Sequence, residues 1–212
     1  MPRKHFPEVR RQQILAAAVR VICDRGLCET SIADIAAAAG VSAALVVYYF
    51  GAKDRLMAAA MAYSEERFYA RIAAVDRTAR PSVQLVRLIQ LCCPSDAEAD
   101  GEVWDDWAMW MELWPRSRHD PLLGPAREAL DRRWWLTISA VVRAGQEAGE
   151  FAAVDPDDFA VRLAALIDGL CIQAALHDPE LPPARVQSLL VASAGRDLGM
   201  PLPEPAEPAL DH

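Results

Sequence analysis

Residues 30–53, TSIADIAAAAGVSAALVVYYFGAK, constrain the fold more than any other stretch of this chain. The first apolar residues recur at i, i+3, i+4 and i+7, the spacing of one face of a short amphipathic helix. Ser31 and Asp34 form a capping box before that helix, and Gly40 can adopt the left-handed conformation that ends it. Ser42 is a good N-cap for a second helix. The stretch therefore predicts two short helices joined by a tight turn.

This arrangement is the signature of a helix-turn-helix, whose second helix enters the major groove of DNA. Double-stranded operator DNA is thus the predicted partner. The groove-facing end of the second helix is poor in polar side chains, so we expect apolar contacts with thymine methyl groups, together with DNA shape, to carry much of the specificity. Tyr48 either faces the groove or packs within the head. The candidate base-contacting residues are Ser42, Ala43, Ala44, Leu45 and Tyr48.

The same stretch resembles the DNA-binding domain of TetR-type bacterial repressors. The matching residues are Thr30 to Ala36, the triplet Gly40-Val41-Ser42, and Tyr49-Phe50 followed by Lys53. The resemblance implies that Thr30, Tyr49 and Lys53 contact DNA phosphates. Many family members have Lys-Gly-Thr-Leu-Tyr after the serine, whereas this chain has Ala-Ala-Leu-Val-Val at residues 43–47, so its sequence preference is expected to differ.

Charge is distributed unevenly along the 212 residues, whose net charge is −8. Residues 1–55 carry eight Lys and Arg against five Asp and Glu, which gives +3, so the remainder carries −11. A basic head on an acidic body confines the attraction for phosphate to one end of the chain. We find no run of apolar residues long enough for a membrane span and no signal-peptide core, so a cytoplasmic location is expected.

Composition and periodicity predict an all-α protein. Hydrophobic residues make up 53% of the chain, glycine is scarce, and proline is confined to junctions. We expect a three-helix helix-turn-helix head over residues 1–52, a helical-bundle effector and dimerisation domain over 53–199, and a disordered tail over 200–212. A long helix is predicted from Lys53 to Arg80, linking head and body. Asp120-Pro121 or Pro125 begins a later helix, and Asp155-Pro156 begins another.

The body has a weaker resemblance to the choline-responsive betaine-pathway repressors within the TetR family. The resemblance rests on LAALIDGL at residues 163–170, Ala174 to Leu176, Trp110, Trp114, and His119 with Pro121. It implies a small-molecule effector domain and a repressor that the effector releases from its operator.

A candidate effector pocket follows from helical spacing. Three tryptophans share one broad face, and an aspartate interrupts an otherwise apolar helix, where an unpaired carboxylate is costly. Either Arg132, Arg133 or Arg143 pairs with this aspartate, or it helps to bind an organic cation beside the aromatic rings. A lipophilic aromatic ligand would also suit such walls. The predicted pocket residues are Trp107, Trp110, Met111, Trp114, Asp168 and Cys171.

A homodimer is expected, because one head makes too few contacts for selective binding. Small residues at helical spacing on the last two helices either form its interface or belong to the internal core. These residues are Ala160, Ala164, Ile167, Ala174, Val186 and Leu190.

An enzyme is the competing class, but the residues do not favour it. The four histidines are scattered, no Glu-x-x-His pair is present, and no glycine-rich loop follows a strand. We therefore predict no catalytic site, no metal and no cofactor. Two alternatives stay open: a helical protein-interaction adaptor without operator binding, and a redox-responsive regulator using Cys92 and Cys93 rather than leaving them as buried apolar thiols.

Overall fold

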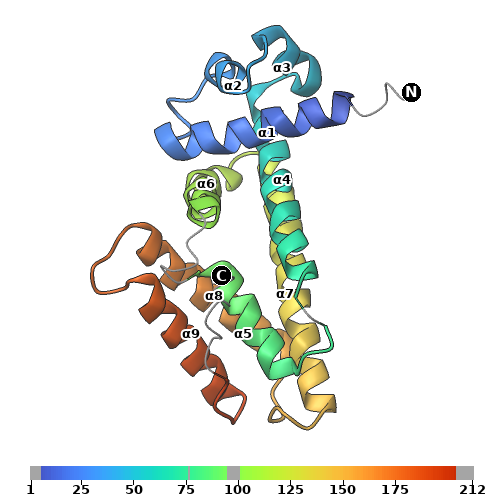
Figure 1. Cartoon of the computed structure of the whole chain (residues 1–212), viewed down its shortest axis with the longest axis vertical. Helices are drawn as coiled ribbons and strands as arrows, with labels where there is room; N and C mark the ends of the chain where they lie inside the picture. Colours follow the sequence, from blue (N-terminus) through green and yellow to red (C-terminus); the bar gives the residue numbers. More distant parts are fainter. Residues whose placement is uncertain (1–5, 76, 95–100, 204–212) are drawn as a thin grey trace, which may run out of the picture. The chain divides into compact units, whose positions relative to one another are not determined.

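The computed structural model describes residues 6–75, 77–94 and 101–203. All regular structure in these ranges is helical, as the sequence predicts, and comprises nine α-helices (Figure 1). In chain order these are α1 (Phe6–Arg25), α2 (Ile32–Ala38), α3 (Ala43–Phe50), α4 (Lys53–Ala73), α5 (Pro81–Cys92), α6 (Gly101–Ser117), α7 (Leu123–Glu147), α8 (Pro156–Ala175) and α9 (Pro183–Asp197).

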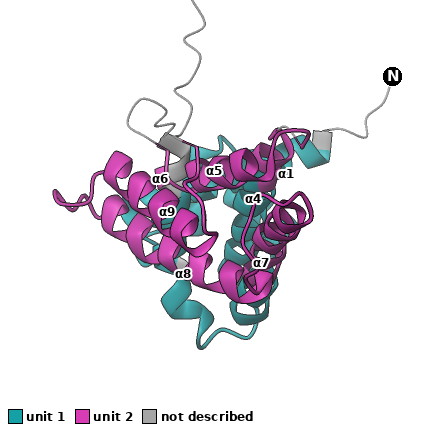
Figure 2. Cartoon of the chain, turned by 90° about the horizontal axis from the view of Figure 1, so that it is seen from below, with its two compact units in different colours: residues 1–68, 105–129 teal, residues 69–104, 130–212 magenta. Residues whose placement is uncertain are grey.

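The chain divides into two compact units, shown in different colours in Figure 2. Unit 1 comprises Met1–Phe68 and Asp105–Ala129, and unit 2 comprises Tyr69–Trp104 and Leu130–His212. Unit 1 thus contains the predicted head together with most of α4 and part of α6 and α7.

The head in unit 1 forms for the local reasons that the sequence indicates. The Ser31 side chain accepts a hydrogen bond from the Asp34 N–H at 3.2 Å, and the Asp34 carboxylate accepts one from the Ser31 N–H at 2.9 Å. Gly40 has φ +64°, the left-handed conformation that the turn requires. Ser42 caps α3 by accepting from the Leu45 N–H at 3.2 Å. The apolar sides of α1, α2 and α3 meet in a core that includes Ile14, Ile22, Ile35, Val46 and Phe50.

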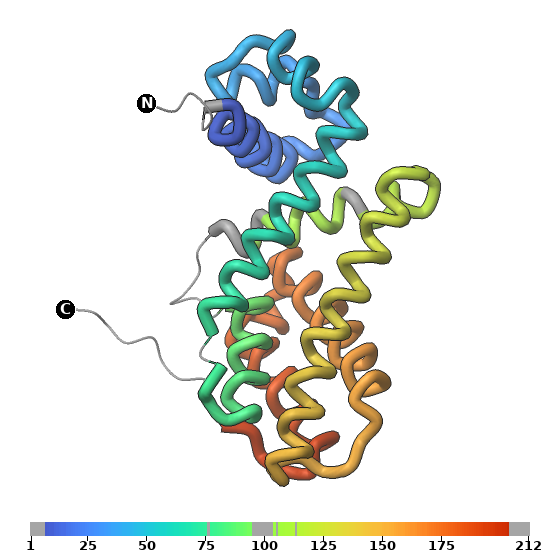
Figure 3. The backbone as a smooth tube through the Cα atoms, turned by 90° about the vertical axis from the view of Figure 1, so that its right-hand side faces the viewer, coloured from blue at the N-terminus to red at the C-terminus, as the bar shows by residue number. Residues whose placement is uncertain are grey.

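In unit 2, α8 and α9 (orange to red in Figure 3) pack side by side and both contact α5. The shared core includes Leu85, Ile89, Leu163, Ile167 and Leu190, each less than 5% exposed. Asp155 caps α8 as predicted, because its carboxylate accepts from the Asp157 and Asp158 N–H groups. These hydrogen bonds hold the pKa of Asp155 below its usual value.

Two predicted helix boundaries were wrong. The helix that begins at Lys53 ends at Ala73 rather than Arg80, with i−3 bonds from the Ala74 and Val75 N–H groups tightening its last turn. The Gln84 side-chain amide donates to the carbonyls of Arg77 and Ala79 and holds the connection to α5.

α7 begins at Leu123, between the two predicted starts, where the Asp120 carboxylate accepts from the Leu122 and Leu123 N–H groups. Gly124 does not interrupt the helix. A Cβ at this position would lie 2.9 Å from the Ser117 carbonyl oxygen, so the close approach requires glycine.

The predicted disorder of the tail is also wrong for its first residues. Leu202 is only 8% exposed. A Cβ at Gly195 would lie 2.7 Å from the Met200 carbonyl oxygen, so the segment after α9 returns closely against that helix. The rest of the predicted tail, residues 204–212, lies outside the described residues.

Candidate nucleic-acid interface and effector site

The exposed face of α3 is apolar and aromatic. Ala43, Ala44 and Val47 are exposed, and Tyr48 is 81% exposed, whereas Val46 is fully buried. The Tyr48 ring meets the Tyr49 ring edge-on, with 5.5 Å between centroids. Tyr48 therefore faces solvent, which removes the alternative that it is buried within the head. The face offers methyl groups and one phenol, which suits contact with thymine methyls better than bidentate base reading.

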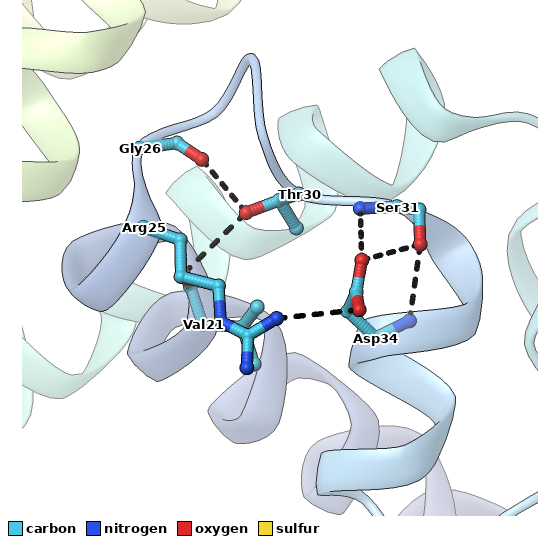
Figure 4. A network of polar contacts seen from close by, with 6 residues as sticks. All are labelled: Val21, Arg25, Gly26, Thr30, Ser31 and Asp34. Carbon is cyan, nitrogen blue, oxygen red and sulfur yellow. Dashed lines mark hydrogen bonds and ion pairs between the residues drawn. The ribbon is translucent and has the colours of Figure 1, made fainter.

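Thr30, predicted to contact phosphate, is 2% exposed. Its hydroxyl donates to the Gly26 carbonyl at 2.8 Å and lies 3.4 Å from the Val21 carbonyl (Figure 4). As folded here, Thr30 connects the end of α1 to the start of α2 and is not available to DNA.

The adjacent capping box is supported by an ion pair at 3.4 Å between Arg25 and Asp34, drawn in the same figure. Hydrogen bonds from Ser31 and the charge of Arg25 hold the pKa of Asp34 below its usual value. The Asp34 carboxylate therefore stays ionised to a lower pH than an ordinary aspartate does.

Lys53 is also predicted to contact phosphate. Like Thr30, it has a hydrogen-bond partner within the chain. Its ammonium donates to the Leu27 carbonyl at 2.8 Å. An ammonium has three donors, so the contact with Leu27 leaves two for a phosphate. Tyr49 is half-buried, and Ser42 is exposed beside the base-facing residues.

The predicted pocket residues divide between the two units. Trp107, Trp110, Met111 and Trp114 belong to unit 1, while Asp168 and Cys171 belong to unit 2. The structure brings the tryptophans together: the rings of Trp107 and Trp114 are edge-on with centroids 6.3 Å apart, and those of Trp110 and Trp114 are 6.1 Å apart.

Asp168 on α8 has no cationic partner among the described residues. Arg143 pairs with Asp157 at 2.6 Å, and the Arg133 guanidinium lies over the Tyr69 ring at 3.4 Å from its centroid. Burial, and then the nearby charge of Asp131 on α7, raise the pKa of Asp168 to about 7. The expected internal arginine partner is therefore not found.

Comparison with known proteins decides the family. The profile described as "Bacterial regulatory proteins, tetR family" matches residues 14–60, and "BetI-type transcriptional repressor, C-terminal" matches residues 81–196. The chain belongs to the TetR family, with a BetI-type C-terminal domain. TetR-family regulators are not enzymes, and this one is a ligand-responsive DNA-binding transcriptional repressor.

Relatives of this TetR-family repressor cover most of its length. The HTH-type transcriptional regulator BetI of Cronobacter sakazakii is 32% identical over 180 residues, 83% of this chain and 84% of the relative. Its counterpart in Burkholderia thailandensis is 31% identical over 182 residues, 83% of this chain and 87% of the relative. A solved transcriptional regulator from Saccharomonospora viridis, in complex with choline, is 32% identical and covers 87% of this chain and 94% of its own, with a TM-score of 0.78.

The residues predicted for the dimer interface of this repressor lie inside the single chain. All six are buried within the single chain, none more than 6% exposed, so as folded here they belong to the internal core of unit 2. The helical spacing was correct, but it marks the faces on which α8, α9 and α5 pack against one another. The exposed apolar residues are instead Val161 on α8, Leu176 at the C-terminal cap of α8, and Leu189 on α9.

The cysteines Cys92, Cys93 and Cys171 of the repressor lie together in unit 2. Cys171 is fully buried, and its thiol lies 3.8 Å from the Cys92 carbonyl. A hydrogen bond with the Cys93 thiol, together with burial, raises the pKa of Cys171. Oxidants react with accessible thiolates, so this environment favours a packing role over redox sensing.

The described residues contain no group of three or more His, Cys, Asp or Glu placed to hold a metal ion. No single helix in these ranges is long and apolar enough to span a membrane; α2 and α3 reach that length and apolarity only when taken together across a 109° bend.

Sequence reasoning missed Glu112 of α6. Its carboxylate accepts from the Leu27 N–H in the head at 3.0 Å. No local motif marks this contact, because the two residues are 85 positions apart. The available signal is that Glu112 and Arg116 share a face of α6 that carries no tryptophan.

Proposed function

We propose that this repressor acts as a cytoplasmic homodimer that a small organic cation releases from its operator. The observation that carries the proposal is Asp168, a largely buried carboxylate with no cationic partner in the described part of the chain. The cation would supply the missing partner.

The energetic argument starts from the cost of the bare carboxylate. Removing an ionised carboxylate from water without a partner is strongly unfavourable, so the group takes up a proton instead. The nearby carboxylate of Asp131 adds repulsion that a cation would relieve. A neutral lipophilic ligand would leave both costs in place. The two carboxyl groups thus favour a positively charged effector.

A related protein supports the same class of ligand. The solved regulator from Saccharomonospora viridis was crystallised with choline, a quaternary ammonium ion. A permanent cation is suited to a carboxylate that resists ionisation, because it cannot give up its charge to the site. The tryptophans of α6 stay a prediction as cation–π partners.

The dimer is proposed on functional and structural grounds. A helix-turn-helix head gains selectivity when two copies read two half-sites about one helical turn apart. The outward apolar side chains of α8 and α9 are suited to a two-fold contact with the same helices of a second copy. Val161, Leu176 and Leu189 are the residues we assign to it.

Titration of the intrinsic tryptophan fluorescence with choline, a primary amine and a neutral aromatic compound tests the effector class. We expect the cations to bind, and choline to weaken a gel-shift complex with the DNA upstream of the repressor's own gene. A response to the neutral compound alone would reject the cationic effector and favour the lipophilic aromatic one. Sedimentation of wild type and Leu189→Arg tests the dimer, which the charged residue should disrupt.

A further inference from the structure

Helix α6 presents two different faces. At 3.6 residues per turn, Trp107, Trp110 and Trp114 lie within about 60° of one another around its axis. Glu112 and Arg116 lie within about 40° of each other, roughly 170° away from the tryptophans. One helix therefore carries the predicted effector-binding rings on one side and two charged residues on the other.

The charged face contacts the loop that follows α1 in the same compact unit. The Glu112 carboxylate accepts from the Leu27 N–H at 3.0 Å, and the Lys53 ammonium donates to the Leu27 carbonyl at 2.8 Å. Leu27 is 1% exposed. Side chains from α6 and α4 thus satisfy both backbone polar groups of one buried residue in the head.

Neighbouring contacts show how closely α6 approaches this loop. Gly26 has φ +77°, and a Cβ there would lie 3.5 Å from the Glu112 Oε1 atom. The Arg116 guanidinium donates to the Cys28 sulfur at 3.2 Å. The loop then passes through Thr30, tied to the Gly26 carbonyl, into the Ser31 cap of α2. A displacement of Glu112 would therefore shift the residues at which the helix-turn-helix begins.

We propose that Glu112 is a positioning residue for operator binding, through which α6 fixes the loop 26–30 and transmits effector binding to the head. The transmission part rests on the proposed function, because it requires an effector whose binding weakens operator binding. The positioning part does not, since it rests on the contact between Glu112 and Leu27 alone. Leu27 is the point at which α6 and α4 act on the same residue.

Charge alone and a positioning role predict opposite changes in DNA affinity when Glu112 is removed. DNA is a polyanion, so removing a carboxylate from a DNA-binding protein strengthens binding through charge alone. A positioning role predicts the opposite, because without Glu112 the buried Leu27 N–H loses its acceptor and the loop loses its fixed geometry. Glu112 is not expected to touch phosphate, so its removal should leave the salt dependence of binding unchanged.

The test compares three variants by fluorescence anisotropy on the DNA upstream of the repressor's own gene. Glu112→Ala removes the acceptor, and Glu112→Gln removes the charge but keeps an oxygen that can accept from Leu27. Glu128→Ala is the matched control, since Glu128 is an exposed carboxylate on the unit 1 part of α7. Circular dichroism melting checks that each variant folds, and amide exchange follows residues 26–30.

We expect Glu112→Ala to weaken operator binding about tenfold at an unchanged salt slope, with faster exchange in the loop. Glu112→Gln should stay within about threefold of wild type, and Glu128→Ala should bind equally or more tightly. Glu112→Ala binding as tightly as Glu128→Ala would overturn the positioning role. If Glu112→Gln folds and binds as weakly as Glu112→Ala, charge rather than hydrogen bonding matters, which also contradicts it.

Choline chloride tests the transmission. In wild type it should weaken operator binding by a measurable factor, and in Glu112→Ala that factor should fall towards one while choline affinity stays the same. If choline weakens operator binding by the same factor in Glu112→Ala as in wild type, transmission through Glu112 is overturned. Wild type that binds operator without any choline effect would instead reject the proposed cationic effector, and the anisotropy comparison would still decide the positioning role.

Discussion

The head and the middle of α8 differ in whether their polar groups have partners among the described residues. In the head, polar groups at the helix starts find partners within four residues: Ser31 with Asp34, Ser42 with the Leu45 N–H, and Thr30 with the Gly26 carbonyl. On α8, Asp168 is largely buried, and its charged neighbour among the described residues is another acid, Asp131. These polar groups of the head are thus satisfied by nearby residues of the head itself, whereas α8 carries a group that a ligand would complete.

The largest effect should come from Asp168→Asn. If a cation completes this site, the substitution should weaken choline binding about 100-fold, because a charge-assisted partner is lost. Operator binding without ligand should be unchanged. Asp197→Asn, which alters an exposed carboxylate on α9, is the control. Isothermal calorimetry measures the affinities, and equal choline binding by both variants would remove the contrast between head and α8.

The same substitution should raise stability above pH 7. The folded-state pKa of Asp168 is about 7 against an ordinary value of 3.8, so the folded protein binds the extra proton. Stability from this group is therefore highest below the unfolded pKa and declines as pH rises towards 7. At pH 8, Asp168→Asn should increase the free energy of unfolding by roughly 2–4 kcal/mol, and at pH 4 by little. Urea unfolding at the two pH values measures the difference.

A smaller effect is expected for Lys53→Ala. It should weaken binding to all DNA sequences about tenfold and lower the salt slope by about one, because one phosphate contact is lost along with the Leu27 contact. Arg185→Ala, which removes an exposed cation on α9, should change neither. An unchanged slope in Lys53→Ala would assign Lys53 to holding the loop alone, and a changed base preference would contradict its contact with the DNA backbone.

The smallest effect concerns the capping box. Ser31→Ala should cost about 1 kcal/mol of stability, because the Asp34 N–H loses its acceptor. Ser188→Ala is the control, since that hydroxyl, exposed on α9, donates to the Ala184 carbonyl and is expected to contribute little. Thermal melting compares the two, and equal loss in both would mean that the box does not stabilise the head.

The same contrast explains what the sequence could predict. Short-range roles could be predicted from spacing alone, because the residues concerned act within a few positions of themselves. These residues are Ser31, Gly40, Ser42 and Asp155. The small-residue stripe of α8 and α9 was placed correctly on one face, but spacing does not say whether that face meets the same chain or a second copy.

Contacts between distant residues could not be predicted from spacing. Thr30 matched a DNA-contact motif, yet burial assigns it to the loop. The contact between Glu112 and Leu27, and the proximity of Asp131 to Asp168, depend on how helices far apart in sequence pack together. Such contacts leave no periodic mark in the sequence, and they are the contacts on which the effector proposal and the positioning role depend.

The most direct test of the central claim is calorimetric titration of the wild-type repressor with choline at pH 6 and pH 8. A cation that binds the ionised Asp168 must displace its proton at the lower pH, so affinity should be about tenfold weaker at pH 6 and binding should release a proton there. Asp168→Asn should show neither the pH dependence nor the proton release. Choline affinity that is the same at both pH values in wild type would contradict Asp168 as the group that meets the cation.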